Sequence, residues 1–251
     1  MDLIERYEHK FLVAERLVPA IRSFARSTST LDRYARADGA YSIRSLYFDT
    51  PSLGLYAANG REQGYRFKVR ARMYPDAPAG PCFLEVKRRC LDVIVKTRAP
   101  VPCDRWREAI DCDGATLDAL TERSRTAVLS FASKVHSHHL EPVLLVQYER
   151  EAYVSEIDSY ARLTLDREIR VQPMTALDFE ADPRRWRLVD HAAQTRSTGS
   201  VAVLELKFER RPPAWMDTMV QRLELVRLSF SKYCYGIANE LVLPSTDRVA
   251  S

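Results

Sequence analysis

The sequence has few of the residues that mark fibrous, disulfide-stabilised or membrane-spanning proteins. Only 8 glycines and 13 prolines occur in 251 residues, which excludes a collagen-like or low-complexity chain. The five cysteines are odd in number and form no Cys-x-x-Cys motif, which argues against a disulfide framework or a thiolate zinc site. No secretory or transmembrane hydrophobic run is present, so we expect a cytoplasmic protein that does not insert directly into membranes.

A large excess of charge of one sign is also absent, because 38 basic residues stand against 34 acidic ones and leave a net charge of +4. This small value does not predict nucleic-acid binding. Within the basic residues lysine is rare, with 7 lysines beside 31 arginines. A lysine ammonium is a compact charge with rotatable donors that suit phosphate oxygens, so the positions of these few lysines are informative.

What the sequence does contain is a series of segments in which apolar and polar residues alternate with period two, the pattern of β-strands. The segments are 6–12, 43–49, 64–74, 82–89, 92–98, 143–154, 160–170 and 200–209, with a short ninth near 186–190. Helical spacing predicts helices over about 14–27, 103–132 and 213–241. We therefore predict an α+β fold, an antiparallel eight-stranded β-barrel with helices outside it or plugging it. We expect one domain over residues 1–251, with its core at about 5–240.

The polar faces of these predicted strands are strongly cationic. In the segment 64–74, Arg66, Lys68, Arg70 and Arg72 share one face and apolar residues occupy the other. An ordinary half-exposed sheet also has one charged face, and for a single strand that interpretation is sufficient. For the whole set it is weaker, because adjacent like charges destabilise a sheet unless an anion lies among them. Six of the seven lysines also fall on these segments or on a late Ser-Lys-Tyr motif; Lys134 is the exception. The pattern predicts a polyanion held by cations, with a divalent metal held by glutamate.

The motifs and their order resemble a known family. They are Arg6-x-Glu8-x-Lys10, Ile43-Arg44-Ser45-Leu46-Tyr47-Phe48-Asp49-Thr50, Arg70-x-Arg72-x-Tyr74, Glu85-x-Lys87, Lys96-x-Arg98, Tyr148-x-Arg150, Arg162-Leu-Thr-Leu-Asp166, Glu205-x-Lys207 and Phe230-Ser231-Lys232-Tyr233. A single Glu-x-Lys is weak evidence, but the ordered set is specific. It resembles the VTC domain of polyphosphate polymerases, within the CYTH or triphosphate tunnel metalloenzyme superfamily, from about Glu5 to Asn239.

The resemblance implies an antiparallel eight-stranded tunnel with basic walls, which binds ATP or another triphosphate, or polyphosphate, with Mn²⁺ or Mg²⁺. The polymerase branch transfers the terminal phosphoryl group of ATP to a polyphosphate chain. By position, the family's phosphate-binding side chains match Lys10, Arg70, Arg72, Lys87, Lys96, Arg162 and Lys232, all of which except Lys96 we also expect to be catalytic. Further substrate contacts are expected from Arg44, Lys68, Arg98, Arg150 and Lys207. The metal is expected at Glu205, with Glu8 and Glu85.

Three alternatives stay open at the level of sequence. A tunnel hydrolase would need a water-positioning carboxylate, for which Glu8, Glu149 and Asp166 are candidates. A non-catalytic polyphosphate-binding module ranks third, since the expected glutamates are present. Nucleic-acid binding ranks last, because the basic faces lack exposed aromatic platforms. Ser229 stands where relatives often have a basic residue, which Arg227 is placed to replace. A membrane-protein partner is compatible with the sequence, and no oligomeric state is predicted.

Overall fold

A computed structural model describes residues 6–91, 93–158, 160–195, 199–228 and 230–242. Its strands all belong to one antiparallel sheet, in which neighbours run in the order β1-β10-β8-β7-β3-β4-β5-β6. These strands are β1 (Arg6–Ala14), β3 (Tyr41–Asp49), β4 (Tyr65–Met73), β5 (Cys82–Cys90), β6 (Val93–Val101), β7 (Glu141–Ser155), β8 (Arg162–Pro173) and β10 (Val201–Glu209). Short β2 (Ser29–Leu31) pairs with β7, and β9 (Arg187–Leu188) pairs with β8. The predicted eight antiparallel strands are confirmed.

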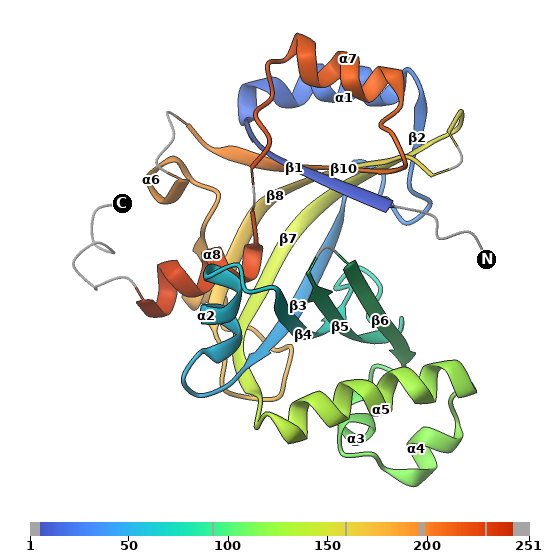
Figure 1. Ribbon diagram of the computed structural model, residues 1–251, viewed down its shortest axis with the longest axis vertical. Helices are drawn as coiled ribbons and strands as arrows, with labels where there is room; N and C mark the ends of the chain where they lie inside the picture. Colours follow the sequence, from blue (N-terminus) through green and yellow to red (C-terminus); the bar gives the residue numbers. More distant parts are fainter. Residues whose placement is uncertain (1–5, 92, 159, 196–198, 229, 243–251) are drawn as a thin grey trace.

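The sheet curls so that its two end strands, β1 and β6, approach each other without pairing (Figure 1). No β1–β6 ladder is found among the described residues, so the predicted barrel is a curled sheet with one open seam. Side chains bridge this seam, because Glu8 of β1 lies 3.5 Å from Lys96 of β6 and 3.7 Å from Lys87 of β5. The enclosure therefore depends on charge at its seam, where a closed barrel would rely on backbone hydrogen bonds.

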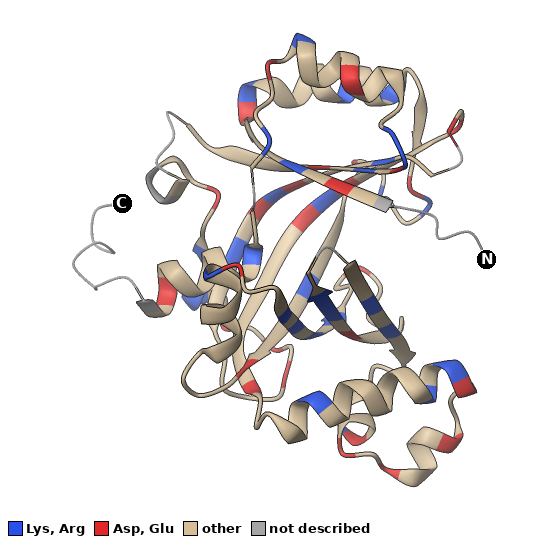
Figure 2. Cartoon of the chain, viewed as in Figure 1, with Lys and Arg blue, Asp and Glu red and all other residues tan. Residues whose placement is uncertain are grey.

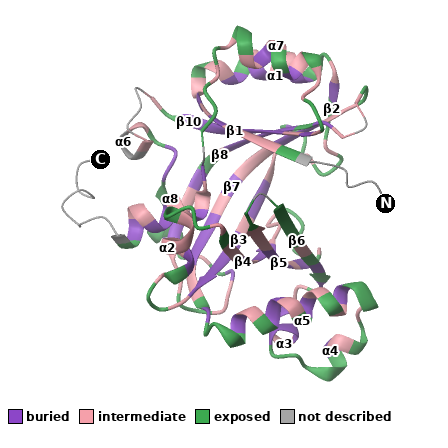
Figure 3. Ribbon diagram, in the orientation of Figure 1, coloured by how far each residue is buried: buried purple, intermediate pink, exposed green. Residues whose placement is uncertain are grey.

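Helices cover the outer, apolar face of the curled sheet at its two ends (Figures 1 and 3). At one end lie α1 (Val18–Arg26) and α7 (Ala214–Arg222), whose Ile21 and Met219 pack with Leu204 and Leu206 of β10. At the other end lie α3 (Trp106–Ile110), α4 (Gly114–Asp118) and α5 (Glu122–Ser137), against β4, β5 and β6. The charged strand faces are thereby left to line the inside.

One helix, α8 (Lys232–Ile237), instead packs on the concave side of the sheet. Its Tyr233 and Ile237 belong to an apolar cluster with Ile43 and Leu144. Gly236 permits this approach, because a Cβ atom at that position would stand 2.7 Å from Leu144 Cδ2. The remaining elements are α2 (Gly54–Gly60), α6 (Ala192–Thr195) and the single turns η1 (Glu15–Leu17), η2 (Pro183–Arg185) and η3 (Ala238–Val242). Helix α8 thus plugs part of the concave face and brings the Ser-Lys-Tyr motif inside.

The predicted continuous helix over 213–241 is wrong. Helix α7 ends at Arg222, and Glu224 adopts a left-handed φ of 49°. The chain then runs extended along the free edge of β1, where the Leu228 N–H donates to the Lys10 carbonyl at 2.9 Å. The predicted helix over 103–132 is likewise divided, because the side chains of Asp113 and Thr121 cap new helices. Among the described residues no helix is both long enough and apolar enough to cross a membrane.

Candidate functional site

The strand register gathers the charged residues into adjacent rungs. Lys68 of β4 lies opposite Lys87 of β5, which lies opposite Lys96 of β6. On the other wall, Lys10 of β1 pairs in register with Glu205 of β10. Figure 2 shows basic and acidic residues along the strands that enclose the concave face. Three ammonium groups in one row repel one another, so the row favours an anion beside it, and Glu8 supplies one near Lys87 and Lys96.

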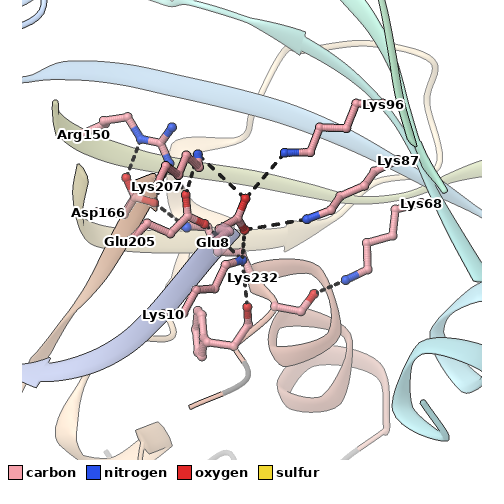
Figure 4. Close-up of polar contacts among 12 residues, drawn as sticks. Glu8, Lys10, Lys68, Lys87, Lys96, Arg150, Asp166, Glu205, Lys207 and Lys232 are labelled. Carbon is pink, nitrogen blue, oxygen red and sulfur yellow. Dashed lines mark hydrogen bonds and ion pairs between the residues drawn. The ribbon is translucent and has the colours of Figure 1, made fainter. Parts of the chain in front are cut away.

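These side chains surround a cavity of about 290 Å³. Every residue predicted to bind substrate or metal, except two, lines it: Glu8, Lys10, Lys68, Arg70, Arg72, Glu85, Lys87, Lys96, Arg98, Arg150, Glu205, Lys207 and Lys232. They come from both walls and from the start of α8, and Figure 4 shows those that surround Glu8 and Glu205. The structure therefore brings together most of the set expected from the sequence.

Arg44 and Arg162 lie outside the cavity, contrary to expectation. Arg44 points to the outer face of β3, where its guanidinium donates to Gln147 Oε1 at 2.7 Å and to the Phe179 carbonyl at 2.8 Å. Ser45 and Tyr47 alternate with it, and Tyr47 takes the inner position. Arg162 is on the charged face of β8 opposite Lys207, but it is exposed at the strand end and does not line the cavity.

The three predicted metal ligands do not converge. Glu8 and Glu205 share Lys10, whose Nζ lies 3.2 Å from Glu8 and 3.0 Å from Glu205. Glu85 is on the opposite wall, where its carboxylate pairs with Arg70 Nε at 2.6 Å and with Arg98 Nε at 3.3 Å. Among the described residues no group of three His, Cys, Asp or Glu side chains is suited to a metal ion. The carboxylate pair available for a metal is therefore Glu8 and Glu205, whereas Glu85 orients Arg70 and Arg98.

The cations around this pair favour the ionised form of both glutamates. Burial and the nearby Glu205 oppose ionisation of Glu8, but the ammonium groups around it prevail and lower its pKa to about 2. Burial also opposes ionisation of Glu205, and Lys207 and Lys10 hold its pKa well below the usual value. Two ionised carboxylates side by side, facing a phosphate-sized cavity, are hard oxygen donors of the kind that Mg²⁺ and Mn²⁺ accept. The residues present thus fit a divalent cation.

Asp166 holds the far wall in place. Its fully buried carboxylate accepts from Arg150 Nε at 2.6 Å and from Lys232 Nζ at 2.5 Å, which joins β7 to the start of α8. Arg150 and Lys232 also lie over the Tyr148 ring, at 5.4 Å and 4.6 Å from its centroid. The sequence presented Asp166 only as a candidate for positioning water, and the structure shows a carboxylate whose oxygens are already engaged.

Among the lining residues that were not predicted as site residues, two accept hydrogen bonds from predicted cations. Tyr47 accepts a hydrogen bond from Arg70 Nη1 at 2.8 Å, and Ser231 accepts one from Lys68 Nζ at 2.7 Å. Both residues lie in motifs on which the family resemblance is based, and that resemblance is the sequence signal that could have identified them. Their roles follow from the cations they orient, because each fixes one donor at the cavity wall.

A second, larger cavity of about 920 Å³ continues from the first. The two share Glu8, Lys10, Lys68, Lys87 and Ser231 in their linings, so they adjoin at the Lys68–Ser231 hydrogen bond. The larger cavity is also lined by Arg66, Arg89 and Arg227. Arg227 is the residue expected to compensate for Ser229, which itself lies outside the described residues. We call the two spaces the inner cavity and the outer chamber.

Lys87 is predicted to make anion binding sensitive to alkaline pH. Burial lowers its pKa to about 8, and the nearby Glu8 only partly opposes this shift. Above pH 8 the free protein must take up a proton to present this ammonium, so tripolyphosphate affinity should fall by up to about tenfold per pH unit. Titration calorimetry without metal, at about pH 7 to 9.5, measures this for the wild type and for Lys87→Arg, whose guanidinium stays charged. Parallel pH profiles for the two proteins would contradict the assignment.

Comparison with known proteins gives consistent matches. A family model described as the VTC domain matches residues 5–241. Vacuolar transporter chaperone complex subunit 4 of Trypanosoma brucei brucei is 30% identical over 127 residues, which cover 48% of this chain and 15% of that protein. Among solved structures, the Hippeastrum protein HpAC1, described as an adenylyl cyclase with a dominant triphosphatase activity, has a TM-score of 0.54 at 12% identity. That alignment covers 96% of this chain and 98% of the other, and it shows a shared fold.

Proposed function

The chain belongs to the VTC domain family, and from this premise we propose that it is a metal-dependent phosphotransferase, which moves the terminal phosphoryl group of ATP onto a polyphosphate chain. The observation that carries the proposal is the cage of cations in the inner cavity. Phosphoryl transfer needs positioning and charge neutralisation more than covalent chemistry. A cage preassembled in a partly buried site supplies both.

The cage supplies these effects from two walls. Arg70, Arg72, Lys87 and Lys96 would hold the triphosphate from β4, β5 and β6. Lys232, held by Asp166 at 2.5 Å, would close the cage from α8. Burial opposes protonation of Arg70, but Glu85 and neighbouring groups keep its pKa well above the usual value, so its charge is constant. Arginine forks can orient phosphate oxygens while lysines neutralise the charge that develops.

Glu8 and Glu205 would hold the divalent cation, Mn²⁺ or Mg²⁺. A cation bound there would neutralise negative charge on the phosphates. Lys10 lies between the two carboxylates, with Nζ also 3.3 Å from the Phe230 carbonyl. Lys10 therefore holds the two carboxylates in place at this end of the cavity, and its ammonium group would be a further donor to phosphate.

A hydrolase is the second candidate, and the carboxylates favour transfer over hydrolysis. Glu149 lies on the outer side of β7, where it accepts from Arg36 Nη2 at 2.8 Å. Asp166 is fully buried and bound to Arg150 and Lys232. Of the three candidate carboxylates, Glu8 alone lines the inner cavity, where it could position a water for attack on a phosphate. A polyphosphate terminus is already an oxyanion and needs no such base. A non-catalytic binding module ranks third, because the carboxylate pair and the cage are both intact.

Partners and location are further parts of the proposal. The Trypanosoma relative is a subunit of a complex, and its alignment spans 15% of its own length. We propose that this domain likewise works beside other subunits, including a membrane protein that receives the product. Its cytoplasmic location stays a prediction from the sequence.

Incubation with ATP and Mn²⁺ or Mg²⁺, followed by a gel for long polyphosphate and an assay for free phosphate, tests the proposal. We expect long chains and ADP. Free phosphate without chains would replace the polymerase with the hydrolase. Retained tripolyphosphate binding with no turnover under either metal would leave the binding module. An exposed-surface variant, Arg123→Gln on α5, serves as the control and should match the wild type.

A further inference from the structure

The hairpin that joins β5 to β6 ends in a cluster of exposed apolar side chains. Tyr65 at the start of β4 is 71% exposed, Leu91 in the turn is 61% exposed, and Val93 at the start of β6 is 62% exposed. Ile94 and Val95 follow at 46% and 40%. Figure 3 shows that β6 is exposed along most of its length. We call these five residues the apolar tip.

The strand register places part of the tip on the convex face of the sheet. Tyr65 lies opposite Cys90, and Cys90 lies opposite Val93, so the three form the last rung of β4, β5 and β6. Farther along the strands α5 covers this face, and Val86 belongs to the same core cluster as Val128 of α5. Cys90 is exposed like its two neighbours. The cover from α5 therefore stops before the last rung and leaves an apolar surface open, which is typical of an interaction site.

Leu91 is an unusual residue for its place in the hairpin. Cys90 pairs with Val93, so Leu91 begins a two-residue turn, whose second residue, Asp92, lies outside the described residues. Leu91 has a left-handed φ of 53°. Such a turn position favours glycine, asparagine or aspartate, and a leucine there strains the backbone. The Leu91 side chain lies beside Gly64 but stays mostly exposed. Burial within the protein does not offset the strain, which indicates a contact with a surface outside it.

Cations stand directly behind the apolar tip. Arg88 is on the convex face, in register with Phe67 on one side and Val95 on the other. Lys134 of α5 lies over the Phe67 ring, 5.0 Å from its centroid. Arg88 Nε has no hydrogen-bond partner among the described residues. The tip therefore combines an apolar end with positive charge behind it.

Charge decides which partner fits this arrangement. A second copy of the chain would bring the same cations against each other, and like charges across an interface oppose association. A surface that is both apolar and anionic removes this repulsion, and a bilayer with anionic lipids is such a surface. Arg88 is three residues from Leu91, or about 10 Å at about 3.4 Å per residue of strand. Apolar groups at a bilayer surface reach about 5–10 Å into the boundary between headgroups and acyl chains. Leu91 can thus touch acyl chains while Arg88 faces lipid phosphates.

We propose that the apolar tip docks on a lipid surface with anionic headgroups. Leu91, Val93 and Tyr65 lie at the boundary between headgroups and acyl chains, and Arg88 and Lys134 face the phosphates. A tyrosine suits this boundary, because its ring is apolar and its hydroxyl is polar. The contact is peripheral and needs no segment that spans the bilayer. It is independent of the proposed phosphoryl transfer.

Co-sedimentation with phosphatidylcholine vesicles, with and without phosphatidylserine, tests the inference. We expect the wild type to bind the vesicles that contain phosphatidylserine, and to bind them more weakly as salt rises. Leu91→Asn should weaken this binding by about tenfold or more, because a leucine removed from water contributes at least that factor. The same variant should raise the melting temperature by up to about 4 °C, since asparagine tolerates a left-handed turn. Weaker binding by a more stable protein excludes misfolding as the cause.

Ile157→Asn is the matched control, because Ile157 is 73% exposed in a different turn, between β7 and β8. This variant should bind vesicles as the wild type does. Undiminished binding by Leu91→Asn, or equal losses in the two variants, would overturn the proposal, and so would a wild type that ignores phosphatidylserine. A wild-type dimer that Leu91→Asn dissociates, seen by analytical ultracentrifugation, would assign the tip to a second copy instead.

Discussion

Glu205→Gln is expected to lower metal-dependent turnover by at least about 100-fold without unfolding the protein. Glutamine keeps the size of the side chain but carries no charge, so the carboxylate pair with Glu8 is lost as a cation site. Lys207, now 2.9 Å from Glu205, and Lys10, at 3.0 Å, would lose part of their counter-charge. Turnover of ATP across a titration of Mn²⁺ and Mg²⁺ measures the effect.

Metal-free binding separates this loss from general damage to the site. Removal of one negative charge from the cage should leave tripolyphosphate affinity unchanged or stronger, because the carboxylate repels phosphate. Circular-dichroism melting should show a folded protein. Glu156→Gln, in an exposed turn, is the matched control and should retain full activity. Normal turnover in Glu205→Gln would remove Glu205 from the metal site.

Asp49→Ala is expected to have the largest effect on stability. The Asp49 carboxylate is fully buried at the end of β3, and it accepts from the backbone N–H groups of Leu55 at 2.7 Å and Tyr56 at 2.8 Å. It also accepts a hydrogen bond from the Tyr233 hydroxyl of α8. Burial, and then this bond to the carboxylate, raise the pKa of Tyr233. One carboxylate therefore fastens both α2 and α8 to the sheet.

Alanine at position 49 would leave these buried donors without an acceptor. Each such group costs about 1–3 kcal/mol, so we expect the free energy of unfolding to fall by about 3 kcal/mol or more. Urea denaturation measures this loss. Activity should fall as well, because α8 carries Lys232 into the cavity. Tyr233→Phe is the comparison, since it keeps the stack on Tyr47 and should lose only about 1 kcal/mol. Stability of Asp49→Ala within about 1 kcal/mol of the wild type would contradict this role.

Asp49 also shows what a sequence motif does and does not reveal. The Leu-Tyr-Phe-Asp-Thr segment contributed to the resemblance, but nothing in its spacing assigned the aspartate a partner. Its partners are 6, 7 and 184 residues away along the chain. The contact with Tyr233, the most distant partner in sequence, forms only because α8 packs on the concave face of the sheet.

Two predictions were wrong for related reasons, namely that Arg44 lies in the cavity and that one helix spans 213–241. Strand β3 is buried on both faces, because α8 packs on its inner side, so its apolar pattern does not identify the face of Arg44. The segment after Arg222 has helical spacing, but the free edge of β1 offers it backbone hydrogen bonds instead. The periodicity of one segment carries no information about the packing or hydrogen-bond partners that distant parts of the chain provide.

The alternation of cations with apolar residues by itself determined the strands, their charged faces and most of the cavity lining, since side-chain direction in a strand depends only on parity. The family resemblance added the expectation that the ligand is a triphosphate or polyphosphate. Tertiary structure alone decided which carboxylates meet. Glu85 and Glu205 share the charged face, but strand order sets them on opposite walls, so that Glu205 joins Glu8 and Glu85 joins arginines. It also decided the open seam and the outer chamber, because both arise from contacts between segments that are distant in sequence.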